Sequence, residues 1–270
     1  MSRVKIGIIG CMGRMGKALT AAVLDSEKAF LVGATVRAGH NAVGSNLKHP
    51  ETGAVTNIKI TEDVKEVIEK SDVILDFTSP EMTLEVAEMA AKSNASLVIG
   101  TTGLSKDDEN LLQDISSKIA IVYSSNYSAG VNLMMHLTKL AASTLDENFD
   151  IEIVEMHHRH KVDAPSGTAL SIGHAAAEGR GKKLDDVMDA GRNGITSERK
   201  KGDIGFAVLR GGNVAGEHTV SFNADDERIE ITHKAGDRAI FARGAVKAAL
   251  WLTNKDVGLY DMCDVLGLKA

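Results

Sequence analysis

The first two dozen residues constrain the fold of this chain more than any other stretch. Residues 4–9 are a short, β-branched apolar run, typical of a buried parallel strand. A glycine turn follows, with Gly10, Gly13 and Gly16 in the spacing G-x-x-G-x-x-G, and residues 17–24 have a helical composition. Strand, glycine turn and helix in this order are typical of the first element of a dinucleotide-binding sheet.

Each glycine of this turn has a physical use. Gly10 permits the tight turn, Gly13 lets the backbone approach a pyrophosphate, and Gly16 lets the helix pack closely on the strand. The helix N-terminus then offers N–H groups and a positive dipole end to the phosphates. The usual fingerprint has a glycine where Met12 stands, and an ordinary strand–helix turn is the alternative interpretation.

Further apolar runs alternate with helix-like runs along the first half of the chain. They lie at residues 30–36, 72–78, 95–99 and 119–123. This alternation predicts an N-terminal Rossmann-like, doubly wound parallel sheet with right-handed crossovers. Residues 40–57, rich in Gly, Asn and His, read as a loop.

Small or hydroxyl-bearing residues stand at the ends of three of the expected strands, at the edge where open α/β sheets bind ligands. We expect them to hold ribose and nicotinamide, although turn chemistry alone explains any single one of them. They are Phe77 and Thr78, Gly100, Thr101 and Thr102, and Ser124, Ser125, Asn126 and Tyr127.

An arginine stands where NAD-selective sites usually have an acidic residue. Arg37 follows the second strand, and Arg14 lies in the glycine turn. Arginine suits a ribose 2′-phosphate through charge-assisted hydrogen bonds. We therefore predict that NADPH is used at least as well as NADH. A solvated surface arginine is the alternative.

The pattern changes after residue 128. Residues 131–145 read as a helix, with Leu133, Leu137, Leu140 and Thr144 on one face. Four alternating runs follow without regular helices between them, which predicts an α+β domain with a mixed open sheet. These runs cover residues 149–156, 204–209, 217–222 and 228–232.

The chain is long enough for two domains. We expect a dinucleotide-binding domain of residues 1–128 with 239–270, because the apolar C-terminal helix should return to it. Residues 129–238 should form a substrate-binding and oligomerisation domain. Within it, residues 178–203 are rich in Gly, Lys, Arg and Asp, typical of a mobile excursion or a subunit-contact loop.

Three histidines, an arginine and a lysine stand together at residues 157–161, directly before a helix start at Ser166, Gly167 and Thr168. Such a start binds carboxylate as readily as phosphate, and histidine is the natural acid near neutral pH. A zinc site is disfavoured because H-H-x-H is not a common tetrahedral spacing, and a solvated basic turn is a further alternative. The chain must leave the sheet after His158, because a straight strand would separate alternate residues.

Composition excludes several classes of protein. A net charge of −6 argues against a nucleic-acid partner, and no apolar run approaches 18 residues, which argues against a membrane span. Cys11 and Cys263 have neither metal-ligand spacing nor a disulfide framework. We expect a cytoplasmic protein without a bound metal.

The segment from residue 157 to 170, H-H-R-H-K-V-D-A-P-S-G-T-A-L, resembles the signature of the 4-hydroxy-tetrahydrodipicolinate reductase (dihydrodipicolinate reductase) family. The resemblance covers essentially the whole chain. Supporting segments are residues 10–16, 76–78, 100–103, 126–132 and 232–234.

The resemblance implies hydride transfer from NADPH or NADH to a dicarboxylic ring substrate, with loss of water, in lysine and diaminopimelate synthesis. It implies that His157 donates and accepts the proton, that Lys161 is a second donor, and that His158, Gly167 and Thr168 bind carboxylates. It further implies a homotetramer formed through the second domain's sheet. The cofactor residues it implies are Gly10, Cys11, Met12, Gly13, Arg14 and Met15, residues 100–102 and residues 124–127.

The sequence departs from the family pattern at two places, Met12 and Arg37, so dual cofactor use is not carried over directly. Two other functions compete with this one. A two-domain amino-acid dehydrogenase of the aspartate or homoserine type would share the first domain but leave residues 157–161 unexplained. A non-catalytic NAD(P)-sensing regulator would bind a partner in a redox-dependent way and show no turnover.

Overall fold

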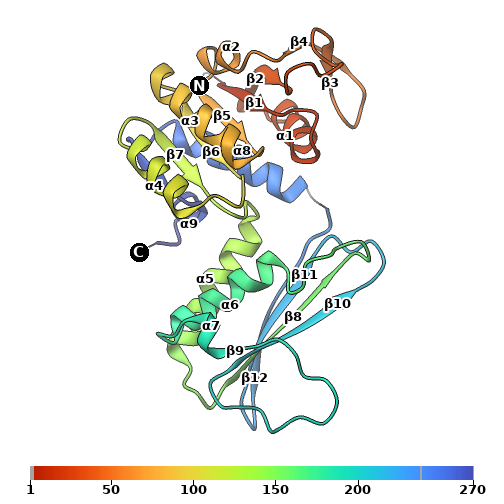
Figure 1. The fold of residues 1–270 in the computed structure, drawn as a ribbon, viewed down its shortest axis with the longest axis vertical. Helices are drawn as coiled ribbons and strands as arrows, with labels where there is room; N and C mark the ends of the chain where they lie inside the picture. The colour runs from red at the N-terminus through yellow and green to blue at the C-terminus, as the bar shows by residue number, and fades with distance from the viewer. Residues whose placement is uncertain (1–2, 238, 270) are drawn as a thin grey trace. The chain divides into compact units, whose positions relative to one another are not determined.

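A computed structural model describes residues 3–237 and 239–269, which form two compact units (Figure 1). One unit runs to Ser128 and resumes at Ala239, and the other begins at Ala129. Arg238, at which we expect the second domain to end, lies outside the described residues. Each unit has its own sheet and its own apolar core.

The first unit contains an eight-stranded sheet in the order β13-β7-β6-β5-β1-β2-β4-β3. Its neighbouring strands are parallel except for the antiparallel pair β3 and β4. The doubly wound Rossmann-like sheet is therefore confirmed, with its topological switch point between β1 and β5. The strands are β1 (Val4–Ile9), β2 (Ala29–Thr35), β3 (Asn46–Lys48), β4 (Val55–Thr61), β5 (Val73–Asp76), β6 (Ser96–Ile99), β7 (Ala120–Tyr123) and β13 (Gly258–Tyr260).

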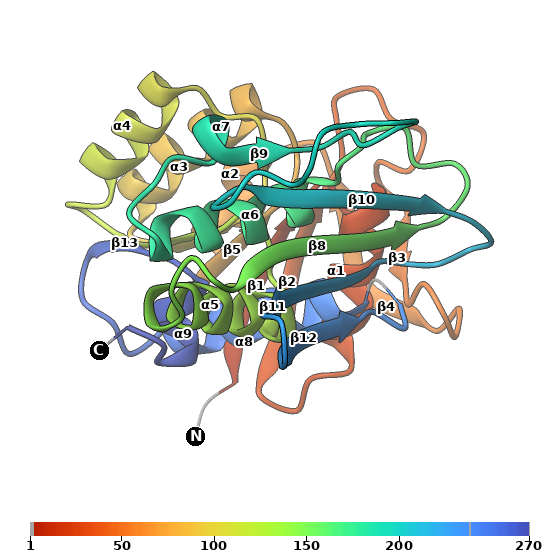
Figure 2. The same cartoon turned by 90° about the horizontal axis from the view of Figure 1, so that it is seen from below.

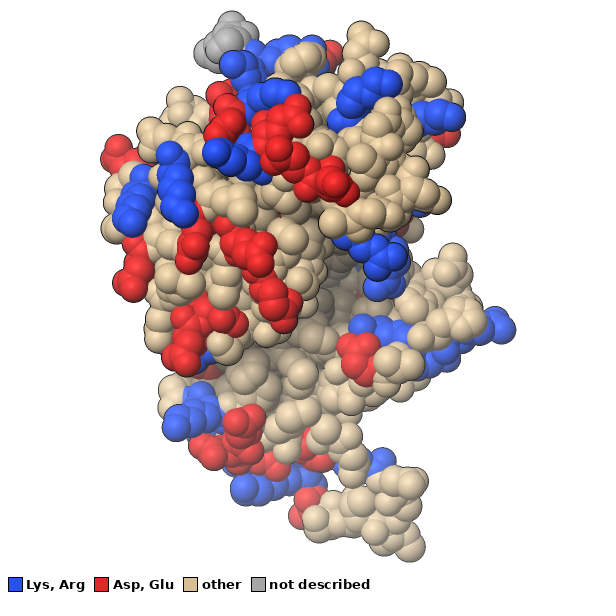
Figure 3. Space-filling model, turned by 45° about the horizontal axis from the view of Figure 1, so that its top comes forward, with Lys and Arg blue, Asp and Glu red and all other residues tan. Residues whose placement is uncertain are grey.

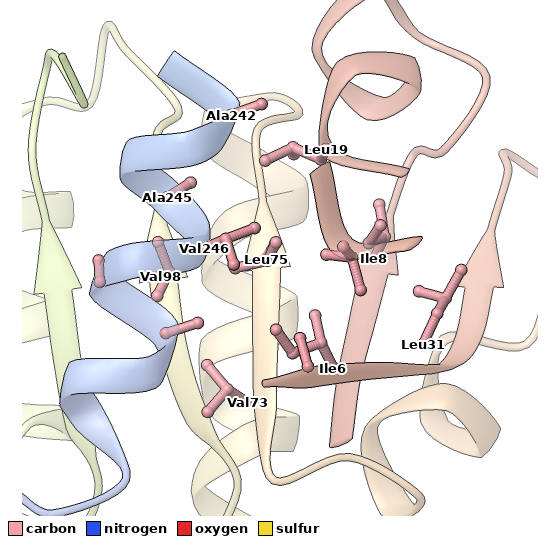
Figure 4. Packing of buried hydrophobic residues seen from close by; sticks show 14 of the residues in the cluster. Ile6, Ile8, Leu19, Leu31, Val73, Leu75, Val98, Ala242, Ala245 and Val246 are labelled. Atoms are coloured by element: carbon pink, nitrogen blue, oxygen red, sulfur yellow. The ribbon is translucent and has the colours of Figure 1, made fainter. Parts of the chain in front are cut away.

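Helices cover both faces of this sheet, because its strands are apolar on both sides. Along β5, Val73 and Leu75 belong to one core cluster and Ile74 belongs to the other. Figure 4 shows Ala242 and Val246 of the C-terminal helix α8 beside the first of these faces. Helices α1 (Arg14–Leu24) and α8 (Ala239–Leu252) pack on that face, α2 (Val64–Glu69), α3 (Pro80–Ser93) and α4 (Lys106–Ile115) pack on the other, and α9 (Met262–Leu266) follows β13.

The expectation of a loop over residues 40–57 is wrong in part. This stretch contains β3 and the start of β4, which pair with each other at the edge of the sheet. The edge strand β13 likewise lacks the apolar run of a buried strand. Short edge strands are defined by backbone pairing with a neighbour, so side-chain periodicity gives little sign of them.

The second unit contains a five-stranded sheet in the order β12-β11-β8-β10-β9. Strands β8, β10 and β9 are parallel neighbours, whereas β11 is antiparallel to β8 and β12, so the predicted mixed sheet is confirmed. Figure 2 shows β10, β8, β11 and β12 of this sheet side by side. The elements are α5 (Ala129–Thr144), β8 (Asp150–His157), α6 (Gly167–Gly179), α7 (Leu184–Val187), β9 (Met188–Asp189), β10 (Ile204–Arg210), β11 (Glu217–Asn223) and β12 (Arg228–Lys234). Residues 178–203, expected to be an excursion, thus include α7 and β9.

Helix α5 forms as expected, but its leucine face is not its buried face. Leu133, Leu137 and Leu140 are exposed, whereas Met134 and Ala142 lie in the core. Helices α5 and α6 approach so closely that a methyl group on Gly179 of α6 would overlap the backbone of α5. Small side chains permit such an approach and leucines do not, which explains why the leucines lie elsewhere.

The glycine turn depends on one close contact. A methyl group added to Gly16 would overlap the carbonyl oxygen of Gly10, whereas one added to Gly13 would lie 3.3 Å from the same oxygen. We predict that Gly16→Ala lowers the free energy of unfolding by about 1–3 kcal/mol, as overpacking does, and that Gly13→Ala costs less. Denaturant unfolding of both variants measures the difference, and equal losses would contradict the role given to Gly16.

Candidate functional site

The residues of the first unit that we expect to bind a nucleotide lie at the carboxyl ends of its parallel strands. Gly10 directly follows β1 with φ +75°, a conformation that suits glycine. Gly13 is the N-cap of α1 and has an extended backbone, and no acidic residue lies in the first turn of that helix. A glycine cradle at a helix N-terminus without a carboxylate is suited to bind a pyrophosphate.

Other residues of the turn differ in their access to solvent. Cys11 is buried, and burial raises the pKa of its thiol to about 11, so this thiol is unreactive at neutral pH. Met12, Arg14 and Arg37 are exposed, and Met15 is half-buried. Met12 replaces the expected glycine without disturbing the turn, because Gly10 already supplies the left-handed conformation.

Hydroxyl groups at the ends of β5 and β6 and on α3 form one network around the buried Asp76. The hydroxyls of Thr78 and Thr83 donate to the Asp76 carboxylate over 2.6 Å each. The backbone N–H of Thr78 donates to Thr101 Oγ1 over 3.0 Å, and Thr83 and Thr101 Oγ1 lie 2.8 Å apart. Burial raises the pKa of Asp76 despite these hydrogen bonds. The network joins two predicted residues, Thr78 and Thr101, through Asp76 and Thr83, which sequence reasoning missed.

The Tyr127 side chain belongs to the core and is therefore not available to a nucleotide. Its ring is 2% exposed, and its hydroxyl lies 2.7 Å from the carbonyl oxygen of Ile99. Its ring centroid is 5.1 Å from that of Phe77, which in turn leaves no room for a side chain at Gly100. Only the backbone of Tyr127 remains for the predicted cofactor contact. Thr102 and Ser125 are exposed, and Ser124 and Asn126 are half-buried.

In the second unit, His157 is the last residue of β8 and faces the same side of the sheet as Glu155. The His157 Nδ1 lies 2.6 Å from Glu155 Oε2. Arg210, on the neighbouring strand β10, donates to both oxygens of Glu155 over 2.8 and 2.9 Å, and the backbone N–H of Ser166 donates over 3.0 Å. Burial alone would raise the pKa of Glu155, but these hydrogen bonds outweigh it and hold that pKa below its usual value.

The chain leaves the sheet directly after His157, one residue earlier than expected. His158 N–H donates to the carbonyl of Val214 over 2.8 Å, and Lys161 N–H donates to the carbonyl of His158 over 3.1 Å. The Lys161 ammonium lies 2.8 Å from Asp163 Oδ2. This turn replaces the strand that would have placed alternate residues on opposite sides.

The helix start at α6 is capped from within. The Ser166 hydroxyl accepts from Ala169 N–H over 3.2 Å and lies 3.1 Å from His218 Nε2. Ser166 is buried, so its side chain serves the helix rather than a ligand. Gly167 is exposed and Thr168 is half-buried, which leaves the first turn of α6 accessible.

His218 was not predicted, although it lies within this cluster. It is buried on β11, with its ring centroid 5.1 Å from that of His157. Burial, followed by smaller effects that include those of the nearby His157 and Lys161, lowers the pKa of His218 to about 4. Both predicted proton donors, His157 and Lys161, thus contribute to the lowered pKa of His218. The alternation of β8 could have identified Glu155, whereas Arg210 and His218 required knowledge of strand pairing.

Within residues 3–237 and 239–269, no three His, Cys, Asp or Glu side chains are placed to hold a metal ion. None of the described helices is both long and apolar enough to cross a membrane. Figure 3 shows acidic and basic side chains interspersed on the visible face rather than gathered by sign.

Two family models cover almost the whole chain. The model described as dihydrodipicolinate reductase, N-terminus, matches residues 4–127, and the one described as dihydrodipicolinate reductase, C-terminus, matches residues 130–266. A 4-hydroxy-tetrahydrodipicolinate reductase of Ruegeria sp. (strain TM1040) is 51% identical over 97% of this chain and 98% of its own length. The one from Hahella chejuensis (strain KCTC 2396) is 48% identical over 98% and 99%.

Solved structures show the same fold. A dipicolinate-bound dihydrodipicolinate reductase from Paenisporosarcina sp. TG-14 superposes with a TM-score of 0.78 at 24% identity, covering 97% of this chain and 98% of that one. A scyllo-inositol dehydrogenase from Lactobacillus casei, with bound NAD(H) and scyllo-inositol, gives a TM-score of 0.56 at 13% identity, covering 99% and 94%.

Proposed function

The chain belongs to the dihydrodipicolinate reductase family, and we propose that His157 and Lys161 deliver the proton in its reaction. The protein is an oxidoreductase that reduces 4-hydroxy-tetrahydrodipicolinate to tetrahydrodipicolinate, a step of lysine and diaminopimelate synthesis. The reaction takes up one hydride and one proton and releases one water. A bound pyridine nucleotide supplies the hydride.

The hydrogen bond between His157 Nδ1 and Glu155 carries the assignment of the proton donor. It occupies one ring nitrogen of His157 and leaves the other for the substrate. Hydride addition to an electron-poor ring builds negative charge, which a nearby acid must neutralise, and histidine titrates close to neutral pH. Lys161, whose side chain is 21% exposed, provides an ammonium group as a second proton donor.

The substrate carboxylates are assigned to His158 and to the start of α6 at Ser166, Gly167 and Thr168. The helix N-terminus presents N–H groups to an anion, and the exposed Gly167 lets a carboxylate approach them. Ser166 contributes by capping the helix. The dipicolinate bound in the Paenisporosarcina enzyme is a dicarboxylate, which supports this assignment.

The nucleotide is assigned to the first unit, with its pyrophosphate at the turn of residues 10–15. Residues 77–78, 100–102 and 124–127 lie at the strand ends, where ribose and nicotinamide bind in such sheets. Arg37 and Arg14 are both exposed and suited to a 2′-phosphate. We propose that the protein uses both NADPH and NADH, and NADPH at least as well.

His157→Gln tests the proton donor. We expect kcat to fall about 100-fold or more, because a general acid contributes roughly that much, while the Kd of the cofactor stays unchanged. Stopped-flow turnover with freshly generated substrate and cofactor titration give the two values. His174→Gln, a change at an exposed histidine on α6, is the matched control. A collapse of cofactor affinity in His157→Gln would show that the role of His157 is wrong.

Arg37→Glu tests cofactor selection. The new carboxylate should repel a 2′-phosphate and accept from a ribose hydroxyl, so KM for NADPH should rise about tenfold while KM for NADH does not. Lys92→Glu, at the exposed last turn of α3, controls for the change in net charge. An unchanged ratio of the two KM values would identify Arg37 as a solvated surface residue.

The homotetramer is assigned to the face of the second sheet opposite α5 and α6. Val154 pairs with Ala207 and Met156 with Leu209 on this face, and Val154 and Leu209 are exposed. An exposed apolar patch of this kind is suited to pack on a second copy. A cytoplasmic location is part of the same proposal, since both cysteines are free.

Leu209→Glu tests this interface. A charge placed in an apolar interface should dissociate the tetramer, because it would be buried without a partner. Sedimentation velocity across a concentration series measures the assembly. Val257→Glu, at an exposed apolar position of the first unit, is the control. A Leu209→Glu protein that sediments as a tetramer would place the interface elsewhere.

A further inference from the structure

A buried carboxylate paired with a half-buried arginine lies behind His157, and the proposed reaction gives this ion pair no part. The Glu155 side chain is 1% exposed. Arg210 holds both of its oxygens and also donates to the carbonyl oxygen of Asp163 over 2.6 Å. Breaking a buried pair is costly, but an intact pair is often no more stabilising than apolar side chains of equal volume. Stability alone therefore does not account for the arrangement.

The contact with His157 suggests what the pair does. An ionised carboxylate has no proton to donate, so Glu155 can only accept at Oε2. Arg210 makes a bidentate pair of hydrogen bonds to that carboxylate, which keeps it ionised and in place. The His157 Nδ1, 2.6 Å away, must then carry a proton whether the ring is neutral or charged. Proton exchange is thereby confined to Nε2.

The other side of the ring is kept clear by a glycine. Gly216, across from His157 at the start of β11, has φ +155°, and a methyl group there would lie 3.0 Å from His157 Nε2. Any larger residue would narrow access to the nitrogen that exchanges protons.

Besides Glu155, the titratable groups around His157 are two histidines with lowered pKa values and a lysine paired with a carboxylate. His218 on β11 stays neutral near pH 7, since burial and His157 itself lower its pKa to about 4. His233 on β12 pairs in register with His218, and burial lowers its pKa too. In the turn after β8, Lys161 is matched by Asp163.

We propose that Glu155, clamped by Arg210, is the positioning residue of the proton-transfer site: it fixes the Nδ1–H tautomer of His157, so that Nε2 is the atom that gives up the proton. This inference rests on the proposed role of His157 as the donor. The arrangement is chemically that of a histidine oriented by a buried carboxylate, in which loss of the carboxylate favours the wrong tautomer.

The test begins with substrate-free protein. We compare wild type with Glu155→Gln by ¹⁵N NMR of the imidazole nitrogens at a pH where His157 is neutral. Wild type should show the proton on Nδ1, and the variant should show a mixture with Nε2–H. In turnover, kcat should fall about 10- to 100-fold with little change in KM, as for other residues that orient a reacting group. The alkaline limb of the kcat/KM profile should move to lower pH, since the imidazolium loses its counter-charge.

Two further variants separate positioning from folding. Glu155→Gln leaves the Arg210 guanidinium without its paired carboxylate. The double variant Glu155→Gln/Arg210→Gln should therefore recover thermal stability, but it should recover neither the wild-type kcat nor the Nδ1–H tautomer. Glu147→Gln removes a carboxylate paired with Lys182 in the same unit, and it should leave both kcat and the tautomer of His157 unchanged.

The outcomes distinguish this inference from the proposed function. An unchanged tautomer in Glu155→Gln, or recovery of kcat in the double variant, would overturn the positioning role. If the tautomer changes while kcat stays at the wild-type value, His157 is not the proton donor. The proposed role of His157 and the inference that rests on it would then both be wrong.

Discussion

A carboxylate taken out of water must find hydrogen-bond donors for its oxygens, and this requirement shapes the polar interior of both units. The two units meet it differently. Asp76, at the end of β5, receives uncharged donors, among them the hydroxyls of Thr78 and Thr83, and burial raises its pKa. Glu155, near the end of β8, receives a guanidinium, and its pKa is held low. One carboxyl group is thus suited to tie strand ends together and the other to hold a fixed negative charge beside a histidine.

Local patterns in the sequence were sufficient for much of the fold. The run before Gly10 and the glycine spacing predicted β1 and α1, and alternation predicted the mixed second sheet. These features are local because a strand or helix start depends on neighbouring residues. The edge strands β3 and β13 were missed because each has only three residues and is defined by backbone pairing, which leaves little side-chain pattern.

The site was harder to predict for the same reason. His157 and Lys161 stand in a conspicuous segment, but Arg210 lies 55 residues beyond the Glu155 that it holds. Only the pairing of β8 with β10 and β11 brings Arg210 and His218 to that histidine. Tyr127 shows a further difficulty, since a hydroxyl that follows a strand can serve the core, which leaves the backbone of Tyr127 for the predicted cofactor contact.

The first unit is assembled from two separate stretches of chain, and this has a consequence for synthesis on the ribosome. Its core cluster includes Ala242, Ala245, Ala249 and Leu252 of α8, which are translated after the whole second unit. While the chain is growing, the apolar side chains on β5 and β6 that α8 will cover remain in water. The second unit, being continuous, can complete its core first. The first unit therefore cannot complete its core before α8 has been translated, and until then its uncovered apolar surface is prone to aggregation.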